Sequence, residues 1–600
     1  MSDETIIQQT QHAFLVAWGH FATEMGLIQA IKGIKLKQKK YRHEPQTKVL
    51  EFLVATLAGL KQLQEISLAA HPLDKDQAVA EAWGQSGWAD YTGVSRTLSG
   101  LSWAEVHEIV QALEQVSQPF LQAELAVLRS RRQRLRLDGD LTGLPVSNTS
   151  QTYPNAAFGH MADDIRLGYQ AAVVSVESVT YRRLWLSVAH HPGDTVACTQ
   201  AEALVLAAEA RMGLRPWRRT EWLRQRIQMV QAAMLPTKQR FQKQHQAVSV
   251  VQTRFLEAQQ QTQQRAQLLA DLTQTYQAQQ RPERPTSRLA QARRRWQAAE
   301  QRCQRREQVW QKMQTKLAKT EAQLAQRQLE LGQLQRRLER FEQDNRTNPD
   351  PLIIEFRLDA GFGTYENLAL LIELGYDIYT KPHNHKIGRY LKSQVNPQTP
   401  WTRVGDNAEM IAWPRLRLKR CPYPLDVALE RFYTGKTRKH SVLLHFGTDR
   451  VTQDLPAWFN RYNGRQLIEA GIKESKQVFQ LHRLKVRAEP AIYLQECFVI
   501  FAANFIRWAT QWLRLHVVPT ENGLDVAQLG VKRQVQVAAH VSAQVIRDSD
   551  GWLLKFSEQS AFAGKVLRLP SGSYPPPSTH VFLTFVPFFN ESYLIAQPLR

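Results

Sequence analysis

The sequence predicts an α/β protein in which a long antiparallel coiled-coil hairpin interrupts a mixed sheet. Three observations lead to this prediction. Two alternating hydrophobic runs, at 134–145 and 351–363, each contain an aspartate next to glycine and read as strands. Between them lie two heptad-patterned stretches joined by a turn with two prolines. A later helical segment, 462–476, carries four polar side chains at helical spacing.

Composition limits the classes of function. With 600 residues, 43% of them hydrophobic, the chain is long enough for several domains or for one core with large insertions. The formal net charge of +22 indicates a polyanionic partner, with nucleic acid as the first candidate and an anionic membrane surface as the second. No apolar run approaches the roughly 20 residues of a spanning helix, and no secretory signal is recognisable, so we expect no membrane insertion.

The cysteines predict neither a zinc site nor a disulfide framework. They are scattered and form no C-x-x-C pair, which fits a reducing compartment. We therefore expect a cytoplasmic location. The four positions are Cys198, Cys303, Cys421 and Cys497.

Residues 1–133 are predicted to form a helical domain. The stretch 31–45 is basic, contains one acid and suits contact with a phosphate backbone. Residues 88–113 read as a turn followed by a short helix that begins around Ser95 and Arg96. This pattern fits a helix-turn-helix DNA reader and also an ordinary helical bundle, and the spacing alone leaves both open.

Residues 134–212 open the predicted sheet. Asp138 and Asp140 share one side of the first strand, while leucines occupy the other side. Strand-like runs follow at 168–178 and 181–191. The D-G-D sequence is also typical of a turn, but its place before these runs favours an acidic strand end.

Residues 213–347 are predicted to be a helical hairpin with two arms of about 40 residues, each reaching roughly 60 Å. The prolines in QQRPERPTS end the first helix and start the turn. Arginines on the outer faces either contact DNA or only solvate the helices. The first seam contains Phe241, Val248, Val251, Phe255, Leu269, Leu272 and Tyr276, and the second contains Met313, Leu317, Leu324, Leu331, Leu334, Leu338 and Phe341.

The second predicted part of the sheet, 348–382, contains a strand that ends at Asp359 and a helix capped by Thr364. Residues 383–455 consist of strand-like runs with turns and are predicted to be a β-rich insertion. The following part, 456–518, contains the polar helix and then a strongly apolar helix.

The C-terminal stretch, 519–600, is predicted to be a small β appendage. Its strand-like runs include QVQVAAHVSAQVI at 534–546 and HVFLTFV at 580–586. The turn-rich SGSYPPPS lies between them.

The polar helix is the most specific motif. Tyr462, Arg465, Glu469 and Lys476 follow the spacing Y-x-x-R-x-x-x-E-x-x-x-x-x-x-K, which places all four near one stripe of a single helix. A carboxylate between two cations suits a metal ligand beside phosphates. Taken alone, the same pattern also fits a solvated helix face with a salt bridge.

This spacing resembles the Y-R-E-K signature of bacterial insertion-sequence transposases of the DDE type, which have a ribonuclease H-like core. The resemblance implies two upstream aspartates at strand ends. D-L-T at Asp140 and R-L-D-A-G-F around Asp359 match the motifs of this family, so Asp140 is preferred over Asp138. V-S-R-T-L at 94–98 resembles the DNA-binding segment, and the β-rich insertion has the position that the family implies.

The resemblance implies that Asp140, Asp359 and Glu469 are catalytic and hold two Mg²⁺ or Mn²⁺ ions. We expect these carboxylates to converge within about 10 Å. Tyr462, Arg465 and Lys476 would contact phosphates, and Ser95 and Arg96 would contact DNA. That last pair belongs to the helical region, not to the carboxylate site.

The activity implied by the resemblance is metal-dependent cleavage at transposon ends and strand transfer into target DNA. Its partners are double-stranded DNA, as terminal inverted repeats and as target, and a second copy of the chain on that DNA. The protein would be cytoplasmic and associated with the nucleoid. Two alternatives remain open: a catalytically inactive DNA-binding protein derived from a transposase, and a coiled-coil interaction protein.

Overall fold

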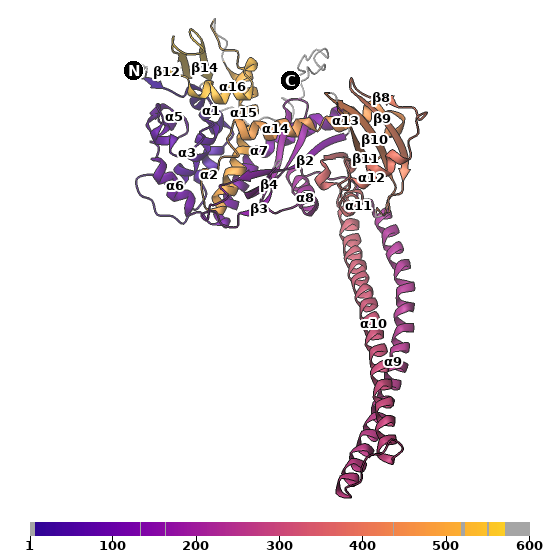
Figure 1. The fold of residues 1–600 in the computed structure, drawn as a ribbon. Coiled ribbons are helices and arrows are strands. Elements are labelled where there is room, and N and C mark those ends of the chain that lie inside the picture. The colour runs from indigo at the N-terminus through magenta and orange to yellow at the C-terminus, as the bar shows by residue number, and fades with distance from the viewer. Residues whose placement is uncertain are drawn as a thin grey trace. The chain divides into compact units, whose positions relative to one another are not determined.

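The computed structural model describes residues 6–570 except 133, 162–163, 420, 436, 518–521 and 549–550. It consists of two compact units. The main unit comprises Met1–Trp217 together with Asp350–Arg600, and the hairpin comprises Arg218–Pro349 (Figure 1). The predicted strand-like run at 580–586 and the turn at 571–578 lie outside the described residues.

The main unit is built on a mixed sheet of ten strands. Its centre is β2 (Arg134–Pro145), which runs antiparallel to β4 (Asp164–Ser178) and parallel to β6 (Ile353–Leu358). On one side, β4 pairs antiparallel with β3 (Ala157–Met161) and β5 (Arg182–Pro192). This arrangement confirms the mixed α/β class and places two strands that are far apart in sequence side by side.

On the other side of β6, the sheet continues through the predicted β-rich insertion. β6 is parallel to β7 (Asp377–Thr380), and β7 pairs antiparallel with β11 (Thr437–Phe446). The strands of 383–455 therefore extend the main sheet rather than form a separate layer, because β11 takes the edge that β7 leaves open. Beyond β11 follow β10 (Leu425–Thr434), β9 (Ala408–Leu416) and β8 (Thr402–Arg403). The short helix α12 spans Lys386–Ser393.

Several helices position the sheet (Figure 1). α7 (Trp103–Arg132) leads toward β2, and α8 (Ala201–Met212) and α11 (Tyr365–Glu373) follow β5 and β6. The predicted apolar helix is α15 (Glu489–His516), which is mostly buried. Asn504 of α15 accepts a hydrogen bond from the Trp185 N–H at 2.9 Å and donates to its carbonyl at 2.8 Å, so the helix is fixed directly to β5.

The two ends of the chain form one module. The predicted N-terminal helices are present: α1 (Ala13–Glu24), α2 (Leu27–Lys32), α3 (Pro45–Leu57), α4 (Glu65–Leu68), α5 (Gln77–Ala82) and α6 (Tyr91–Ser99). However, β1 (Ile6–Thr10) pairs antiparallel with β12 (Ala543–Asp548), and β13 (Gly551–Phe556) and β14 (Val566–Pro570) complete a four-stranded sheet. The N-terminal region is therefore not purely helical, and the C-terminal strands do not stand alone, because β1 completes their edge.

Part of the predicted C-terminal strand is helical. The run at 534–546 begins within α16 (Val531–Gln536), continues through a turn of 3₁₀ helix at Ala538–His540, and becomes a strand only at Ala543. Val535, Ala538 and Ala539 are fully buried. Their spacing is helical, so burial on one helix face overrides the alternating pattern.

The short helix predicted to begin around Ser95 is α6, which begins earlier, at Tyr91. Asp90 caps α6 by accepting a hydrogen bond from the Gly93 N–H at 2.8 Å, and a strong N-cap of this kind fixes the helix start at Tyr91. Ser95 and Arg96 consequently lie inside α6 rather than at its first turn. Arg96 is exposed and Ser95 is half-buried. α6 has 9 residues, and the next helix, α7, has 30.

The hairpin confirms the two predicted antiparallel helices. α9 (Thr220–Ala278) and α10 (Arg288–Arg346) have 59 residues each, so each is about 88 Å long at 1.5 Å per residue. The arms exceed the predicted length because α9 continues through Pro236. Phe255 and Trp310 stack across the seam with ring centroids 5.4 Å apart.

Candidate active site

The register of two parallel strands brings the two predicted aspartates together. β2 and β6 pair from Arg134 opposite Ile353 to Gly139 opposite Leu358, so the next residues are Asp140 and Asp359. Neighbouring strands lie about 4.8 Å apart, and residues at matching register project to the same face. Asp140 and Asp359 therefore stand side by side where the β2–β6 pairing ends.

Local backbone contacts orient both carboxylates. Asp140 Oδ1 accepts a hydrogen bond from the Leu141 N–H at 2.9 Å. Asp359 caps a turn of 3₁₀ helix at Ala360–Phe362, and its Oδ1 accepts from the Gly361 N–H at 2.9 Å. Gly361 lets the chain turn close to the carboxylate of Asp359, because a Cβ atom there would lie 3.1 Å from Asp359 Oδ1.

The Y-R-E-K residues do not lie on one helix, in contrast to the prediction. α13 (Leu455–Asn463) carries Tyr462, and α14 (Gln466–Gln477) carries Glu469 and Lys476. Between them the Arg465 N–H donates to the Tyr462 carbonyl at 3.1 Å in a tight turn. The turn passes directly over a buried arginine, because a Cβ atom at Gly464 would lie 2.3 Å from Arg357 Nη1.

Arg465 links the first aspartate to the glutamate. Its Nη2 lies 2.7 Å from Asp140 Oδ2, and its Nη1 lies 2.6 Å from Glu469 Oε1. Two oxygens held by one guanidinium are at most about 8 Å apart. The side chain of Arg465 is 10% exposed and that of Glu469 is 58% exposed, so the pair reaches from the protein interior to solvent.

Electrostatics connect the same residues. The pKa of Asp140 is raised to about 6, because burial together with repulsion from Asp359 and Glu469 outweighs the opposing charge of Arg465. Burial lowers the pKa of Lys476, and the negative charge of Asp140 opposes that shift. Burial raises the pKa of Tyr462, with Asp359 and Glu469 adding to the shift and Arg465 opposing it. These residues therefore share one electrostatic environment.

Asp138 and Asp140 have different partners in the structure. Asp138 is opposite Arg357 in the β2–β6 register, and both are buried. Arg357 binds it through two hydrogen bonds, Nε to Oδ1 at 2.6 Å and Nη2 to Oδ2 at 2.7 Å. Asp138 is thereby held by a structural partner, while Asp140 faces Arg465.

Arg357 is a positioning residue that the sequence reading missed. It fixes Asp138 and supports the turn at Gly464, and its Nη2 also lies 3.2 Å from Glu177 Oε2. A signal was present in the sequence, since Arg357 precedes Asp359 by two residues as Asp138 precedes Asp140. Equal offsets on neighbouring parallel strands place the two side chains opposite each other.

A second buried network anchors α13 to the strands. Glu355 of β6 is fully buried and binds Arg134 at 2.7 Å and Arg136 at 2.9 Å. Arg461 of α13 lies 3.5 Å from the same carboxylate and also pairs with Asp449. These contacts hold the end of α13, and with it the turn that carries Arg465, against the sheet.

The ligand type of the three acids suits a hard divalent cation. Asp140, Asp359 and Glu469 offer carboxylate oxygens, which Mg²⁺ and Mn²⁺ prefer. Arg465 lies between Asp140 and Glu469 and compensates part of the negative charge of the three acids. Among the described residues, no three His, Cys, Asp or Glu side chains are grouped closely enough to hold a metal. The guanidinium of Arg465 stands where a cation shared by Asp140 and Glu469 would bind.

The other predicted site residues lie elsewhere. Ser95 and Arg96 are on α6, which Figure 1 shows at the edge of the main unit and away from β2. Arg96 Nη2 donates to Thr92 Oγ1 at 3.3 Å. The structure therefore does not bring these two residues to the carboxylates.

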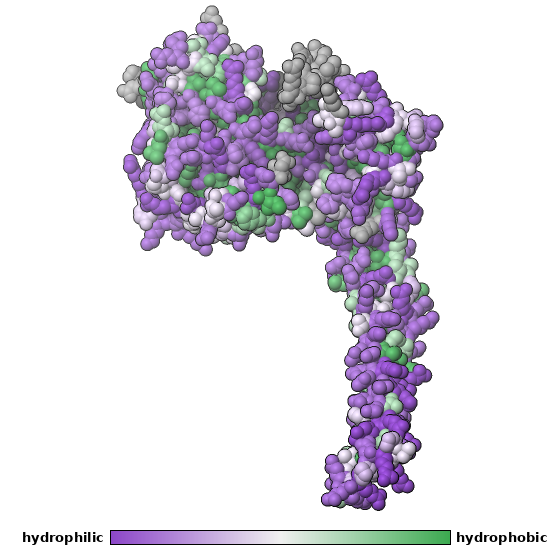
Figure 2. Space-filling model, viewed as in Figure 1, coloured by the Kyte–Doolittle hydropathy of each residue, from purple (hydrophilic) through white to green (hydrophobic). Residues whose placement is uncertain are grey.

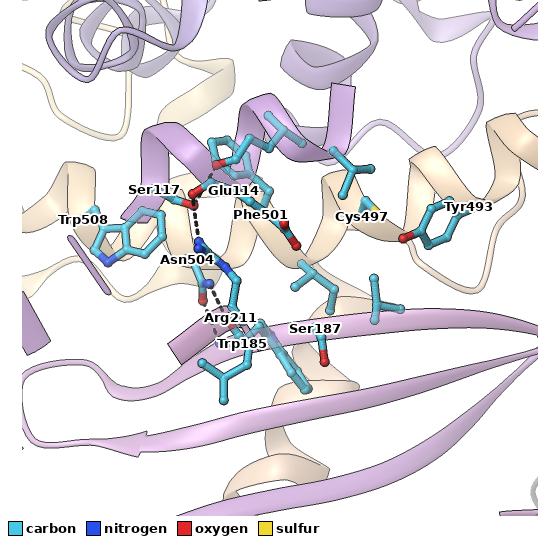
Figure 3. Close-up of a pocket in the computed structure, with 15 residues that line it drawn as sticks. Glu114, Ser117, Trp185, Ser187, Arg211, Tyr493, Cys497, Phe501, Asn504 and Trp508 are labelled. Atoms are coloured by element: carbon cyan, nitrogen blue, oxygen red, sulfur yellow. Dashed lines mark hydrogen bonds between the residues drawn. The ribbon is translucent and has the colours of Figure 1, made fainter. Parts of the chain in front are cut away.

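A separate cavity of about 80 Å³ lies among α7, α15 and β5 (Figure 3). Arg211 of α8 donates to Ser117 Oγ at 2.5 Å beside it, and Asn504 is bonded to Trp185 as described above. Burial raises the pKa of Glu114, and Arg211 opposes that shift. None of the lining residues belongs to the carboxylate group, so this cavity is not part of the candidate active site.

Comparison with known proteins identifies no matching family model and no similar curated protein. No helix within the described ranges is both long and apolar enough to cross a bilayer.

Proposed function

We propose that the protein is a transposase of the DDE type, which cleaves DNA at transposon ends and joins them to target DNA. The observation that carries this proposal is the meeting of Asp140 and Asp359 on adjacent parallel strands, with Arg465 linking Asp140 to Glu469. These three acids come from three distant parts of the sequence.

The sheet supports a ribonuclease H-like core. Three antiparallel strands, β2, β4 and β5, open the sheet, and the first carries Asp140. The parallel strand β6 then brings the second acid to the same edge. Both features agree with the arrangement that the resemblance to these transposases implies.

Asp140, Asp359 and Glu469 would hold two Mg²⁺ or Mn²⁺ ions. Such ions activate an attacking oxygen and stabilise a leaving oxygen at phosphorus. In the first reaction a water oxygen bonds to phosphorus as the bond to the 3′-oxygen breaks, which leaves a 3′-hydroxyl and a 5′-phosphate. In the second reaction this 3′-hydroxyl loses its proton and bonds to a target phosphorus, while the bond from that phosphorus to the target 3′-oxygen breaks and leaves a 3′-hydroxyl on the target strand.

The cations of the site suit phosphate binding. Besides its two paired nitrogens, Arg465 has a buried Nε–H without a hydrogen-bond partner within the described part of the chain. An unpaired buried donor is costly, and a phosphate oxygen is a strong acceptor for a guanidinium. Lys476 adds a point charge within electrostatic reach of Asp140. Tyr462 adds a hydroxyl at the same site.

The test compares Glu469→Gln with wild type in a cleavage assay on labelled terminal-repeat DNA with Mg²⁺, beside a gel shift on the same DNA. Loss of a metal ligand removes more than about 3 kcal/mol of transition-state stabilisation, so cleavage falls more than about 100-fold. DNA binding persists, because basic residues elsewhere supply most of the affinity.

A matched control is Glu474→Gln on the same helix. Glu474 pairs with Arg183 at 3.3 Å and Arg507 at 2.9 Å, away from the acids of the site. This variant has lower stability but cleaves at a rate close to wild type. Cleavage by Glu469→Gln at the wild-type rate would contradict the proposal.

The second candidate function is a DNA-binding protein without catalytic activity. One observation favours it: Arg465 already neutralises part of the charge of Asp140 and Glu469. The same assay separates the two candidates, since an inactive protein binds the DNA but leaves it uncut with both Mg²⁺ and Mn²⁺. In either case the proposed partner is duplex DNA in the nucleoid, bound by two copies of the chain.

A further inference from the structure

Most of the positive charge of the protein resides in the hairpin. Within Arg218–Pro349 there are 26 lysines and arginines against 11 aspartates and glutamates, a net charge of +15 out of the total of +22. Figure 2 shows a predominantly hydrophilic surface along this unit. The location of the charge along the two helices decides whether it serves solubility or recognition.

The cations gather on one flank of the hairpin. The seam positions a and d recur from Thr220 and Leu223 in α9 and from Leu289 and Ala292 in α10. The g positions of both helices then form one flank, which we call the basic flank. Between 240 and 319 its g residues include the exposed cations Arg240, Arg254, Arg288, Arg295, Arg302 and Lys316.

Neighbouring positions widen the basic flank. Arg305, Lys312 and Lys319 occupy the c position of α10, which lies beside g on the helix surface, and all three are exposed. In the same stretch, Glu257 and Asp271 at the c position of α9 are the acids on this side. The cations therefore far outnumber the carboxylates that face them.

Across the seam, the basic flank places like charges opposite each other. Arg226 and Glu330, both at g positions, pair at 3.4 Å and set the register. Counting by heptads from this pair puts Arg240 opposite Lys316. Coiled coils usually place opposite charges at such positions, so this arrangement costs stability in the free protein.

The opposite flank, formed by the e positions, contains acidic residues as well as cations, as is usual in coiled coils. Its e positions in α10 include Glu300, Glu307 and Glu321, and Arg224 of α9 pairs with Glu342 at 2.6 Å. The two flanks of one hairpin thus differ in sign. Surface charge that served only solubility would not require positive and negative residues to lie on different flanks.

Duplex DNA fits the basic flank better than a membrane does. From Arg288 to Lys319 the cations extend about 47 Å along α10, more than the roughly 34 Å of one turn of B-DNA. Arginine binds phosphate through its planar fork. A helix that binds membranes needs a free apolar face, whereas here the apolar stripe is used in the seam between α9 and α10, and the exposed Leu268 and Val309 on this flank do not form a continuous stripe.

We propose that the basic flank of the hairpin is a DNA-binding surface that contacts the phosphate backbone of duplex DNA without reading its sequence. This surface belongs to the hairpin alone and does not depend on the proposed catalysis. Phosphate contacts neutralise the like charges across the seam, so DNA binding also stabilises the hairpin.

The experiment measures binding of the full-length protein to a 40-base-pair duplex of arbitrary sequence by fluorescence anisotropy. EDTA is present throughout, so catalysis plays no part. The test variant carries Arg295→Gln, Arg302→Gln and Arg305→Gln. The matched control carries Lys238→Gln, Arg293→Gln and Arg336→Gln, which are exposed cations at e and f positions of the same helices. Circular dichroism at 222 nm verifies that both retain their helices.

Each lost phosphate contact reduces the slope of log K against log salt by about 0.9. The test variant therefore loses about 2 to 3 units of slope and binds at least about tenfold more weakly at 100 mM salt, while the control changes less than about threefold. A third variant, with lysine at the three test positions, retains the wild-type slope because it retains the charges.

Equal losses in the test and control variants would overturn the proposal, since they indicate general charge rather than a defined flank. An unchanged slope in the test variant would overturn it as well. Vesicles containing phosphatidylglycerol provide the membrane comparison. Binding to them that exceeds DNA binding and depends on the same three arginines would assign the flank to membranes instead.

Discussion

The candidate active site and the hairpin treat charge in opposite ways. At the site, Asp140 and Glu469 share the guanidinium of Arg465, and the buried neighbours Asp138 and Arg357 neutralise each other at hydrogen-bonding distance. On the basic flank, exposed cations of the same sign face one another across the seam. The first region has an excess of negative charge beside a buried framework, and the second has an excess of positive charge in solvent.

Under the two proposals above, each region would be completed by a charged ligand of opposite sign. A cation would compensate the carboxylates, and a polyanion would compensate the basic flank. By contrast, charges that stabilise the fold are paired inside the protein, as in the Asp138–Arg357 pair and the contacts of Glu355 with Arg134 and Arg136. Substitutions at the buried ion pairs, at the candidate active site and on the basic flank should therefore change the free energy of unfolding by different amounts and in different directions.

The largest effect on stability is expected for Arg357→Met. It leaves Asp138 buried without its partner, which costs about 3–5 kcal/mol. Urea unfolding monitored by tryptophan fluorescence measures the shift in midpoint. The double variant Asp138→Leu with Arg357→Met removes both charges and recovers most of the loss. A loss below about 1 kcal/mol in the single variant would show that the pair does not hold the fold.

An intermediate effect is expected from pH at Asp140. Because its pKa rises from 3.8 to about 6 on folding, the folded state binds the proton more tightly than the unfolded state between these values. Stability therefore falls as pH rises through this window, by up to about 3 kcal/mol, and the loss is nearly complete about one pH unit above the folded-state pKa. Asp140→Asn should flatten this slope in urea unfolding measured from pH 4 to 7. A slope identical to wild type would contradict the assignment.

The smallest effect is expected for Lys316→Glu in the hairpin. The change turns the facing pair with Arg240 from like to opposite charge and stabilises the helices by about 0.5 kcal/mol. Thermal melting followed at 222 nm measures this gain. DNA binding should weaken at the same time. Lys238→Glu on the other flank is the control, and the contrast fails if it weakens DNA binding as much.

The sequence alone determined the elements that depend on local pattern. Alternation predicted the strands that carry Asp140 and Asp359, and heptads with two prolines predicted α9 and α10. The apolar run predicted α15. These patterns are readable because side chains repeat with the period of the element itself, every two residues in a strand and every three or four in a helix.

Only the tertiary structure decided how these elements meet. The parallel register of β2 and β6 assigned Asp138 to Arg357 and left Asp140 beside Asp359. Packing of Gly464 over Arg357 divided the predicted single helix in two. Pairing of β1 with β12 joined the two ends of the chain in one sheet. Each outcome depends on contacts between residues more than 100 positions apart, and a local sequence pattern carries no information about such contacts.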